Sequence, residues 1–191
     1  MSTLLQTAAL HPGSGTFVAV VGSSGVGKDS LMAYARARLP ADQFVFVRRV
    51  ITRDADGGSE DHDTLDRACF EAAARAGQFA LSWEAHGLCY GLPISLEADL
   101  ASGRTVVANV SRAIIPTLTE RYPHALVVEV VAERQVIAER LAARGRETQD
   151  AIRSRLDRTV TTALPPGVVR INNSTGLETA GERLVQLLQA C

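Results

Sequence analysis

The stretch "GSSGVGKDS", residues 22–30, contains the pattern that decides the fold. In phosphate-binding loops a Gly is followed by four residues, a second Gly, a Lys and then a hydroxyl residue that binds magnesium. Gly22, Gly27 and Lys28 keep this spacing, but Asp29 takes the hydroxyl position. Ser30, the hydroxyl residue, follows one place later. The stretch therefore predicts a phosphate-binding loop with an unusual carboxylate beside the lysine.

The residues around this loop favour a nucleoside triphosphate site over a tight turn with a solvated lysine. The apolar run 16–22 predicts a buried strand, and apolar residues at helical spacing over 30–39 predict a helix. Glycines let successive N–H groups turn inward, and the positive end of the helix adds to the attraction for anions. The residues expected to hold the nucleotide are Gly22, Ser23, Ser24, Gly25, Val26, Gly27, Lys28, Asp29 and Ser30.

Composition bounds the class of protein. The chain has 191 residues, 46% hydrophobic and 21% charged, which is typical of one soluble globular domain. A formal net charge of -1 gives no global reason to expect nucleic acid or an anionic membrane as a partner. No stretch approaches the roughly 20 apolar residues of a membrane span, and the first sixteen residues lack Lys and Arg, which argues against a secretory signal. Three widely spaced cysteines suit a reducing cytoplasm, where we expect the protein to act.

Strands alternate with helices along the rest of the chain. This alternation predicts an α/β fold in which helices cover both faces of a parallel sheet, with the loop at the carboxyl end of its strand. Residues 1–15 are expected to form a flexible tail and 16–191 a single domain. Further strands are expected at 44–51, 105–110, 125–131 and 167–171, an irregular segment at 52–63, a hairpin at 79–91, and helices at 65–77, 94–103, 112–122, 133–145, 147–162 and 177–190.

Four other stretches resemble guanylate kinase in their order and spacing. They are "VITRD" (50–54), "YGL" (90–92), "RLAARGRETQDAIRSRL" (140–156) and "INN" (171–173), and the resemblance extends over residues 16–190. It implies a P-loop kinase with an acceptor-binding lobe at about 48–104 and a small lid at about 140–160. It also implies that Arg140, Arg144 and Arg155 contact ATP as catalytic residues and that Asn172 takes part in nucleotide binding. The alternative for the arginines is a solvated basic helix.

The acceptor lobe departs from guanylate kinase at the residues that read the base. The family offers a glutamate, an aspartate and a serine to guanine, and these positions hold Leu81, Asn109 and Arg49 here. Leu81 cannot accept a hydrogen bond, and Arg49 can only donate. GMP is therefore expected to bind poorly.

Groups that could bind acceptor phosphate remain. Arg53 and Tyr90 match the family's phosphate ligands, and His62 stands where the family has a tyrosine. Of the neighbours Arg48 and Arg49 only one should face the cleft, and Arg49 is favoured, with surface solubility as the alternative. The acidic run 54–63 could bind ribose hydroxyls or a metal, or be a solvated loop. The substrate-binding candidates are Arg49, Arg53, Asp61, His62, Tyr90, Asn109 and Arg112.

Extra cations without a base reader suggest an acceptor with two phosphates. Together with "GKDS", "RRVITR" and "EDH", this resembles the ribose 1,5-bisphosphate phosphokinases, a branch of the guanylate kinase-like group in bacterial phosphonate degradation. The resemblance implies transfer of the ATP γ-phosphoryl group to the 1-phosphate of a phosphorylated sugar, ribose 1,5-bisphosphate, giving 5-phosphoribosyl 1-diphosphate (PRPP), with Lys28 as a catalytic residue. The alternatives are a nucleoside monophosphate kinase with altered contacts and a non-catalytic interaction module.

A carboxylate oxygen is a hard ligand, so Asp29 is expected to bind Mg²⁺ directly or through one water. The alternative is that Asp29 only starts the helix, and that Ser30 or water binds the metal.

Overall fold

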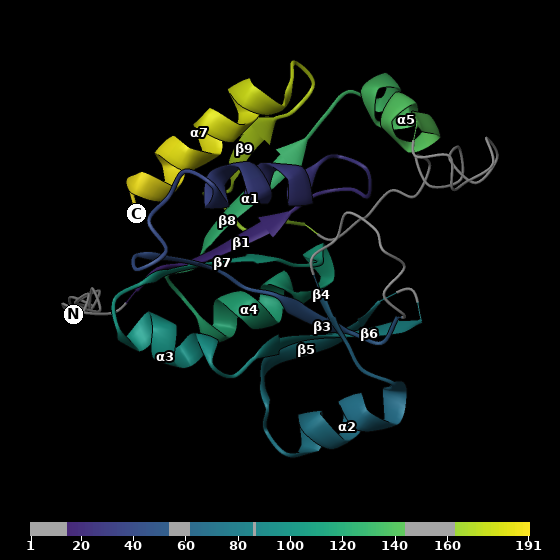
Figure 1. Ribbon diagram of the computed structural model, residues 1–191, viewed down its shortest axis with the longest axis vertical. Helices are drawn as coiled ribbons and strands as arrows, with labels where there is room; N and C mark the ends of the chain where they lie inside the picture. The colour runs from purple at the N-terminus through teal and green to yellow at the C-terminus, as the bar shows by residue number, and fades with distance from the viewer. Residues whose placement is uncertain (1–14, 54–61, 86, 144–162) are drawn as a thin grey trace, which may run out of the picture.

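A five-stranded parallel sheet forms the centre of the molecule, with strand order β2-β7-β1-β8-β9 (Figure 1). The computed structural model describes residues 15–53, 62–85, 87–143 and 163–191. All four strand pairs are parallel, as the alternation of strands and helices predicts. The strands are β1 (Phe17–Val21), β2 (Phe44–Phe46), β7 (Thr105–Asn109), β8 (Leu126–Val131) and β9 (Val169–Asn172).

Helices cover both faces of this sheet (Figure 1). On one face α1 (Lys28–Arg36), α5 (Arg134–Ala143) and α7 (Leu177–Gln189) share a core with alternate residues of β1 and β8. On the other face α3 (Leu96–Ala101) and α4 (Ile115–Arg121) pack against the remaining β1 residues. Since β1 is buried from both sides, its sequence is continuously apolar. None of the described helices is long and apolar enough to cross a membrane.

A second, mixed sheet extends from the first and has strand order β4-β3-β6-β5. The expected hairpin is confirmed, because β5 (Phe79–Ala85) and β6 (Leu88–Pro93) pair antiparallel. The helix α2 (Arg67–Arg75) packs on it through a stacked pair of phenylalanine rings, Phe70 and Phe79, whose centroids are 4.6 Å apart. These elements fall within the stretch expected to form the acceptor-binding lobe.

The expected single strand over 44–51 is wrong, because the chain changes sheets within it. β2 ends at Phe46, and β3 (Arg49–Ile51) belongs to the second sheet. The backbone N–H of Val47 still donates to the Val107 carbonyl at 2.9 Å, after which the chain leaves the parallel sheet. The segment 52–63 is not irregular to its end either, since β4 (His62–Thr64) pairs with β3.

The expected helix over 112–122 forms with a modified start. A 3₁₀ turn, η1 (Arg112–Ile114), precedes α4, and the hydroxyl of Ser111 accepts a hydrogen bond from Ala113 N at 3.3 Å. Pro116 lies in the first turn of α4, where its missing N–H has no intrahelical partner to lose. The expected helix at 147–162 and the tail at 1–14 lie outside the described residues, as does nearly all of the expected lid.

A close approach joins α1 to α7. Gly181 on α7 faces the ring of Tyr34 on α1, and a Cβ added to Gly181 would lie 2.6 Å from Tyr34 Cγ. The Tyr34 hydroxyl donates a hydrogen bond of 2.6 Å to Glu182. Only a glycine therefore allows these two helices to pack at this distance.

We expect Gly181→Ala to destabilise the protein by about 1–3 kcal/mol, because the added methyl group would overpack this contact. The sign of the stability change is informative, because a Gly→Ala substitution in the interior of a helix otherwise stabilises the protein by up to about 1 kcal/mol. Urea denaturation measures the change, and Gln186→Ala, at an exposed position of α7, is the control. A stabilised Gly181→Ala variant would contradict the packing described.

Candidate active site at the carboxyl ends of the parallel strands

The phosphate-binding loop connects β1 to α1 at the carboxyl end of the sheet, as its sequence predicts. Gly27 caps α1 with a φ of 96°, a left-handed conformation that favours glycine. A side chain at Gly27 would also collide with the amide of Asn173. The Lys28 ammonium folds back over the loop and donates to the Gly22 and Ser23 carbonyls at 2.8 and 3.1 Å. A cation and the N-terminus of a helix thus meet at one place, which suits a phosphate group.

Two residues far along the chain support this loop. The Asn173 side chain is 2% exposed and donates from Nδ2 to the Val26 carbonyl at 2.8 Å. Arg140 donates to the same carbonyl at 3.3 Å and to the Asn173 carbonyl at 2.8 Å. Arg140 therefore lies beside the loop, as expected, whereas Arg144 and Arg155 lie outside the described residues.

Asn173 is a residue that the sequence analysis missed. The nominated neighbour, Asn172, accepts hydrogen bonds from the backbone and hydroxyl of Ser174 at 2.9 and 2.7 Å, so its part in nucleotide binding stays a prediction. The "INN" motif marked this end of β9, but two adjacent asparagines gave no signal as to which one faces the loop. Within the described part of the chain, the buried Oδ1 of Asn173 has no hydrogen-bond partner. A donor on a bound nucleotide would satisfy that oxygen.

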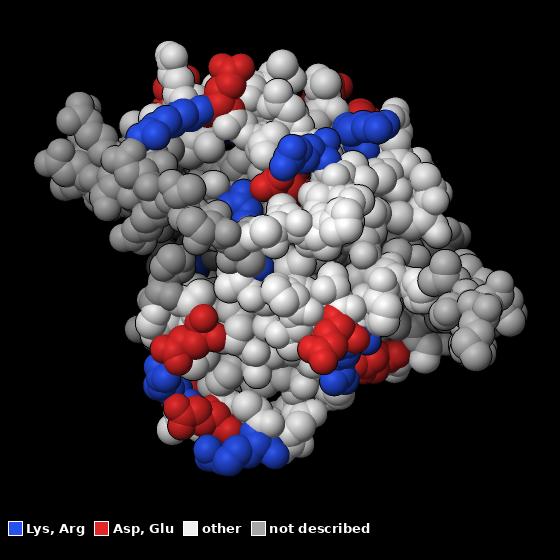
Figure 2. Space-filling view, turned by 180° about the vertical axis from the view of Figure 1, so that it is seen from behind, with Lys and Arg blue, Asp and Glu red and all other residues white. Residues whose placement is uncertain are grey.

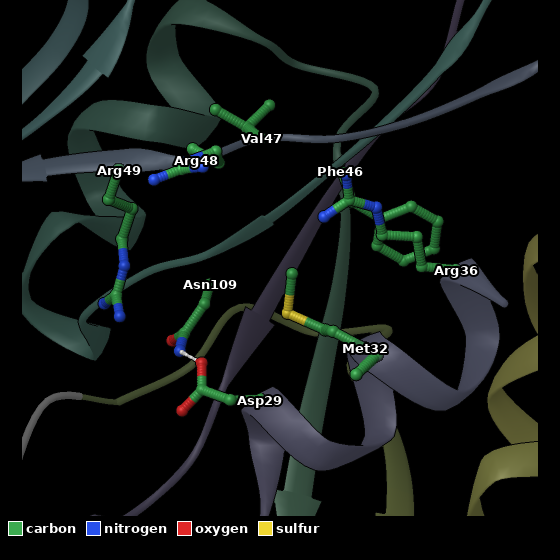
Figure 3. Close-up of a pocket in the computed structure, with 9 residues that line it drawn as sticks. Asp29, Met32, Arg36, Phe46, Val47, Arg48, Arg49 and Asn109 are labelled. Carbon is green, nitrogen blue, oxygen red and sulfur yellow. Dashed lines mark hydrogen bonds between the residues drawn. The ribbon is translucent and has the colours of Figure 1, made fainter. Parts of the chain in front are cut away.

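Asp29 is held in place by a neighbouring strand. Asn109, 5% exposed at the end of β7, donates from Nδ2 to Asp29 Oδ1 at 2.7 Å. Figure 3 shows this bond and the second carboxylate oxygen of Asp29 directed away from Asn109 (Figure 3). Asn109 thus hydrogen bonds to the residue beside Lys28, and its expected role at the acceptor stays a prediction.

The chemistry of Asp29 fits a magnesium ion shared with a nucleotide. Among the residues that the structure describes, no three His, Cys, Asp or Glu side chains gather closely enough to hold a metal. Magnesium does not need such a cage, because it is commonly bound by one or two carboxylates together with phosphate oxygens and water. At the start of α1, the second carboxylate oxygen of Asp29, which does not accept from Asn109, is the oxygen that could bind this magnesium ion.

A pocket of about 110 Å³ opens beside Asp29 between α1 and the two sheets. Both Arg48 and Arg49 line it, although only one had been expected to face the cleft. The expectation assumed that both residues belong to a strand, but β3 begins at Arg49, so alternation does not apply to Arg48. Arg48 also pairs with Asp63 at 2.9 Å.

The second sheet brings three of the predicted acceptor residues together: Arg49, His62 and Tyr90. Arg49 is the register partner of His62, and Tyr90 is the partner of Ile51. Arg53 follows β3 by two residues, and its place at the acceptor stays a prediction. The guanidinium carbon of Arg49 lies 5.9 Å from the centroid of the Tyr90 ring. That ring stacks on Trp83 with centroids 5.4 Å apart. Leu81 is buried at 5% exposure, and Asp61 lies outside the described residues.

Arg112 takes part in a charge cluster instead of lining the pocket. Its guanidinium donates to Glu129 Oε1 at 2.9 Å, and Arg170 donates to Glu129 Oε2 at 2.8 Å. Burial alone would raise the pKa of Glu129, but the hydrogen bonds from Arg170 and Arg112 outweigh it and lower the pKa below the ordinary value. This cluster ties the segment after β7 to β8 and β9. A role of Arg112 at the acceptor stays a prediction.

Charges on the outer surface of the second sheet pair with one another. Figure 2 shows acidic and basic side chains alternating over the lower part of the molecule, where α2 lies (Figure 2). Arg67 on α2 accounts for part of this pattern, because it pairs with Glu71 at 3.2 Å and with Glu84 at 3.0 Å. The pocket beside Asp29 differs, since its lining includes more guanidinium groups than carboxylates.

Comparisons with known proteins agree with this site. No family model matches the chain. It is 56% identical to the ribose 1,5-bisphosphate phosphokinase of Chelativorans sp. (strain BNC1) over 178 residues, 92% of this chain and 85% of the relative. The enzyme of the same name from Burkholderia pseudomallei is 49% identical over 90% of this chain and 94% of the relative. A bifunctional ribose 1,5-bisphosphokinase-thymidine phosphorylase of Azorhizobium caulinodans is 46% identical over 93% of this chain but 26% of that protein.

A solved structure supports the fold. Guanylate kinase from Anaplasma phagocytophilum superposes with a TM-score of 0.67, covering 93% of this chain and 86% of its own. Because the two sequences are 18% identical, the likeness shows the fold alone. The expected guanylate kinase-like α/β architecture is thereby confirmed.

We expect Glu129→Gln to cost about 1–3 kcal/mol of stability at pH 7, because the arginines lose a charged acceptor. A carboxylate with a lowered pKa stabilises the folded state above its ordinary pKa and loses that contribution as the pH falls through the folded-state pKa. The difference in the free energy of unfolding between the parent protein and Glu129→Gln should therefore become smaller below about pH 4.3. Denaturant titrations over a pH series measure it, with exposed Glu120→Gln as control. A difference that stayed constant at acidic pH would contradict the stabilising role of the charge.

Proposed function

The chain belongs to the family of ribose 1,5-bisphosphate phosphokinases, and we propose that it transfers the γ-phosphoryl group of ATP to the 1-phosphate of ribose 1,5-bisphosphate. The products are PRPP and ADP, and bacterial phosphonate degradation is the setting that the family resemblance implies. The observation that carries this proposal is Arg49 in the acceptor pocket beside an intact phosphate-binding loop. The names of the close relatives support the same activity.

The acceptor pocket is poorly suited to a guanine base. Leu81, at one of the base-reading positions, is buried in the apolar core and does not line the pocket, and the guanidinium of Arg49 can only donate hydrogen bonds. Asn109 donates from its Nδ2 to Asp29, so among these three positions its Oδ1 is the acceptor offered to a base. A buried donor of the base left without an acceptor costs about 1–3 kcal/mol. A phosphate dianion, which only accepts hydrogen bonds, suits Arg49 better.

The reaction needs no general base. A phosphate monoester has a second pKa near ~6, so the 1-phosphate is already a dianionic nucleophile at neutral pH. One of its oxygens attacks the γ-phosphorus, the bond from that phosphorus to the β–γ bridging oxygen breaks, and ADP leaves with the electron pair. Catalysis then consists of alignment and neutralisation of charge.

The chain's own residues divide these tasks. Lys28 and Arg140 lie at the loop and neutralise the donor phosphates, and we assign the same task to Arg144 and Arg155. Arg49 and Arg53 position the acceptor, with Tyr90 beside them. Bound Mg²⁺ supplies further neutralisation of the β- and γ-phosphates, and Asp29 is the residue that would hold it.

Two other functions compete with this one. A nucleoside monophosphate kinase would need groups that read a base, and the residues at those positions argue against it. A non-catalytic interaction module has no need for a phosphate-binding loop, whereas this loop is complete from Gly22 to Lys28.

An assay that couples ADP release to a spectroscopic signal tests the proposal. With ATP as donor, ribose 1,5-bisphosphate should give a kcat/KM about tenfold or more above that of GMP, because the guanine donors lack acceptors. Other nucleoside monophosphates serve as controls for general acceptor promiscuity. Comparable kcat/KM values for GMP and ribose 1,5-bisphosphate would refute the proposed acceptor.

The Asp29→Asn variant tests the magnesium assignment. It keeps the size of the side chain and removes the charge, so the Mg²⁺ concentration for half-maximal rate should rise about tenfold or more. Asn109→Ala should shift it in the same direction, because Asp29 then loses its hydrogen-bond donor. Binding of nucleotide without metal should change little.

Asp42→Asn, at an exposed position, is the matched control for this titration. A magnesium dependence of Asp29→Asn that coincides with the parent protein would leave Asp29 as a residue that only starts the helix α1.

A further inference from the structure

The pocket beside Asp29 is also lined by an arginine that has no place in the reaction described so far. Arg36 lies in the last turn of α1, and it follows Asp29 by seven residues, so the two share one face of the helix. Figure 3 shows Arg36 entering the pocket from α1 and Arg49 entering from the opposite side (Figure 3). The described residues that line the pocket are Asp29, Met32, Ala33, Arg36, Phe46, Val47, Arg48, Arg49 and Asn109.

The charge of this lining complements a phosphate monoester. Among the described residues that line it, three guanidinium groups, from Arg36, Arg48 and Arg49, accompany one carboxylate, that of Asp29. Asp29 already accepts a hydrogen bond from Asn109. A phosphate monoester carries about −1.5 to −2 charges near neutral pH and three acceptor oxygens. Guanidinium groups are the side chains that bind such oxygens with two parallel hydrogen bonds.

The ion pair between Arg48 and Asp63 is weak enough for a phosphate to compete with it. Arg48 pairs with Asp63 at 2.9 Å, but both side chains are about half exposed. Exposed pairs of this kind are worth little, about 0–1 kcal/mol in general. A phosphate dianion can therefore share or replace Asp63 as the partner of Arg48.

The pocket extends along α1, because Asp29 beside the loop and Arg36 in the last turn both line it. An α-helix rises about 1.5 Å per residue, so the backbone at Arg36 lies about 12 Å along α1 from Lys28. An acceptor with two phosphates can therefore direct one toward the loop and the other toward Arg36.

We infer that Arg36, Arg48 and Arg49 form a subsite for the 5-phosphate of the acceptor, and that Arg36 makes the enzyme select a sugar bisphosphate over a sugar monophosphate. This inference rests on the proposed function, since it assigns the second phosphate of the same substrate. The 1-phosphate then lies toward Asp29 and Lys28, where it meets the donor.

Two variants of one helix test the inference. Arg36→Met removes the guanidinium and keeps an unbranched apolar stem. Arg38→Met makes the same change two residues later, where Arg38 stacks on Tyr34 at 3.4 Å and pairs with Glu182 at 3.3 Å, outside the pocket lining. The acceptors are ribose 1,5-bisphosphate and ribose 1-phosphate, which lacks the 5-phosphate.

Arg36→Met should lower kcat/KM for ribose 1,5-bisphosphate about tenfold or more through KM, because a charge-assisted hydrogen bond is lost. With ribose 1-phosphate as acceptor, the kcat/KM of Arg36→Met should equal that of the parent protein. The kcat/KM of Arg38→Met should equal that of the parent protein with both acceptors. An equal loss with both acceptors, or no loss with either, would overturn the subsite.

Calorimetry with ribose 5-phosphate separates this inference from the proposed function. If the parent protein does not turn over ribose 1,5-bisphosphate, the proposed function fails, and the binding of ribose 5-phosphate decides the subsite. Binding that weakens about tenfold in Arg36→Met but not in Arg38→Met supports the subsite. Absent binding to the parent protein, or equal binding to both variants, rejects it.

Discussion

The burial of β1 between β7 and β8 is the constraint on which the site depends. Its five residues are at most 2% exposed, so the strand cannot shift without exposing apolar surface on both faces of the sheet. The phosphate-binding loop begins where this strand ends, and the neighbouring parallel strands end at the same edge. Asn109 at the end of β7 and Asn173 after β9 consequently reach Asp29 and the loop carbonyl of Val26. A rigid sheet edge thus positions polar groups that lie far apart in the chain.

Asp29 shows how a carboxylate can be kept beside a triphosphate. Its partner in the structure is the neutral amide of Asn109, which fixes one oxygen without cancelling the charge. A cationic partner would have left less negative charge to attract a metal. The N-terminus of α1 favours a negative side chain by roughly 0.3–1 kcal/mol, which offsets part of the repulsion from phosphate.

Local patterns predicted the loop, the buried strand and the hairpin, because each depends on neighbours in sequence. The change of sheet between Phe46 and Arg49 was not visible, since "FVFVRRVI" has the composition of a continuous strand and only its tertiary partners divide it. The ion pair between Arg112 and Glu129 was not visible either, because Glu129 lies seventeen residues away on another strand. Arg36 falls within the expected helix at 30–39, and no pattern in the sequence singled it out. Partners brought together by the fold, more than residue types, decided these positions.

The candidate site draws on both sheets, and α1 lines the pocket between them. Residues at the edge of the five-stranded sheet surround the phosphate-binding loop, whereas Arg49, His62 and Tyr90 belong to the second sheet. The division is not complete, because Asn109, at one of the base-reading positions, lies on β7 of the first sheet and hydrogen bonds to Asp29 beside the loop. The helix α1 adds a second link, because its first turn carries Lys28 and Asp29 and its last turn carries Arg36, which lines the same pocket as Arg49. A change in this helix would therefore affect the loop and the pocket together.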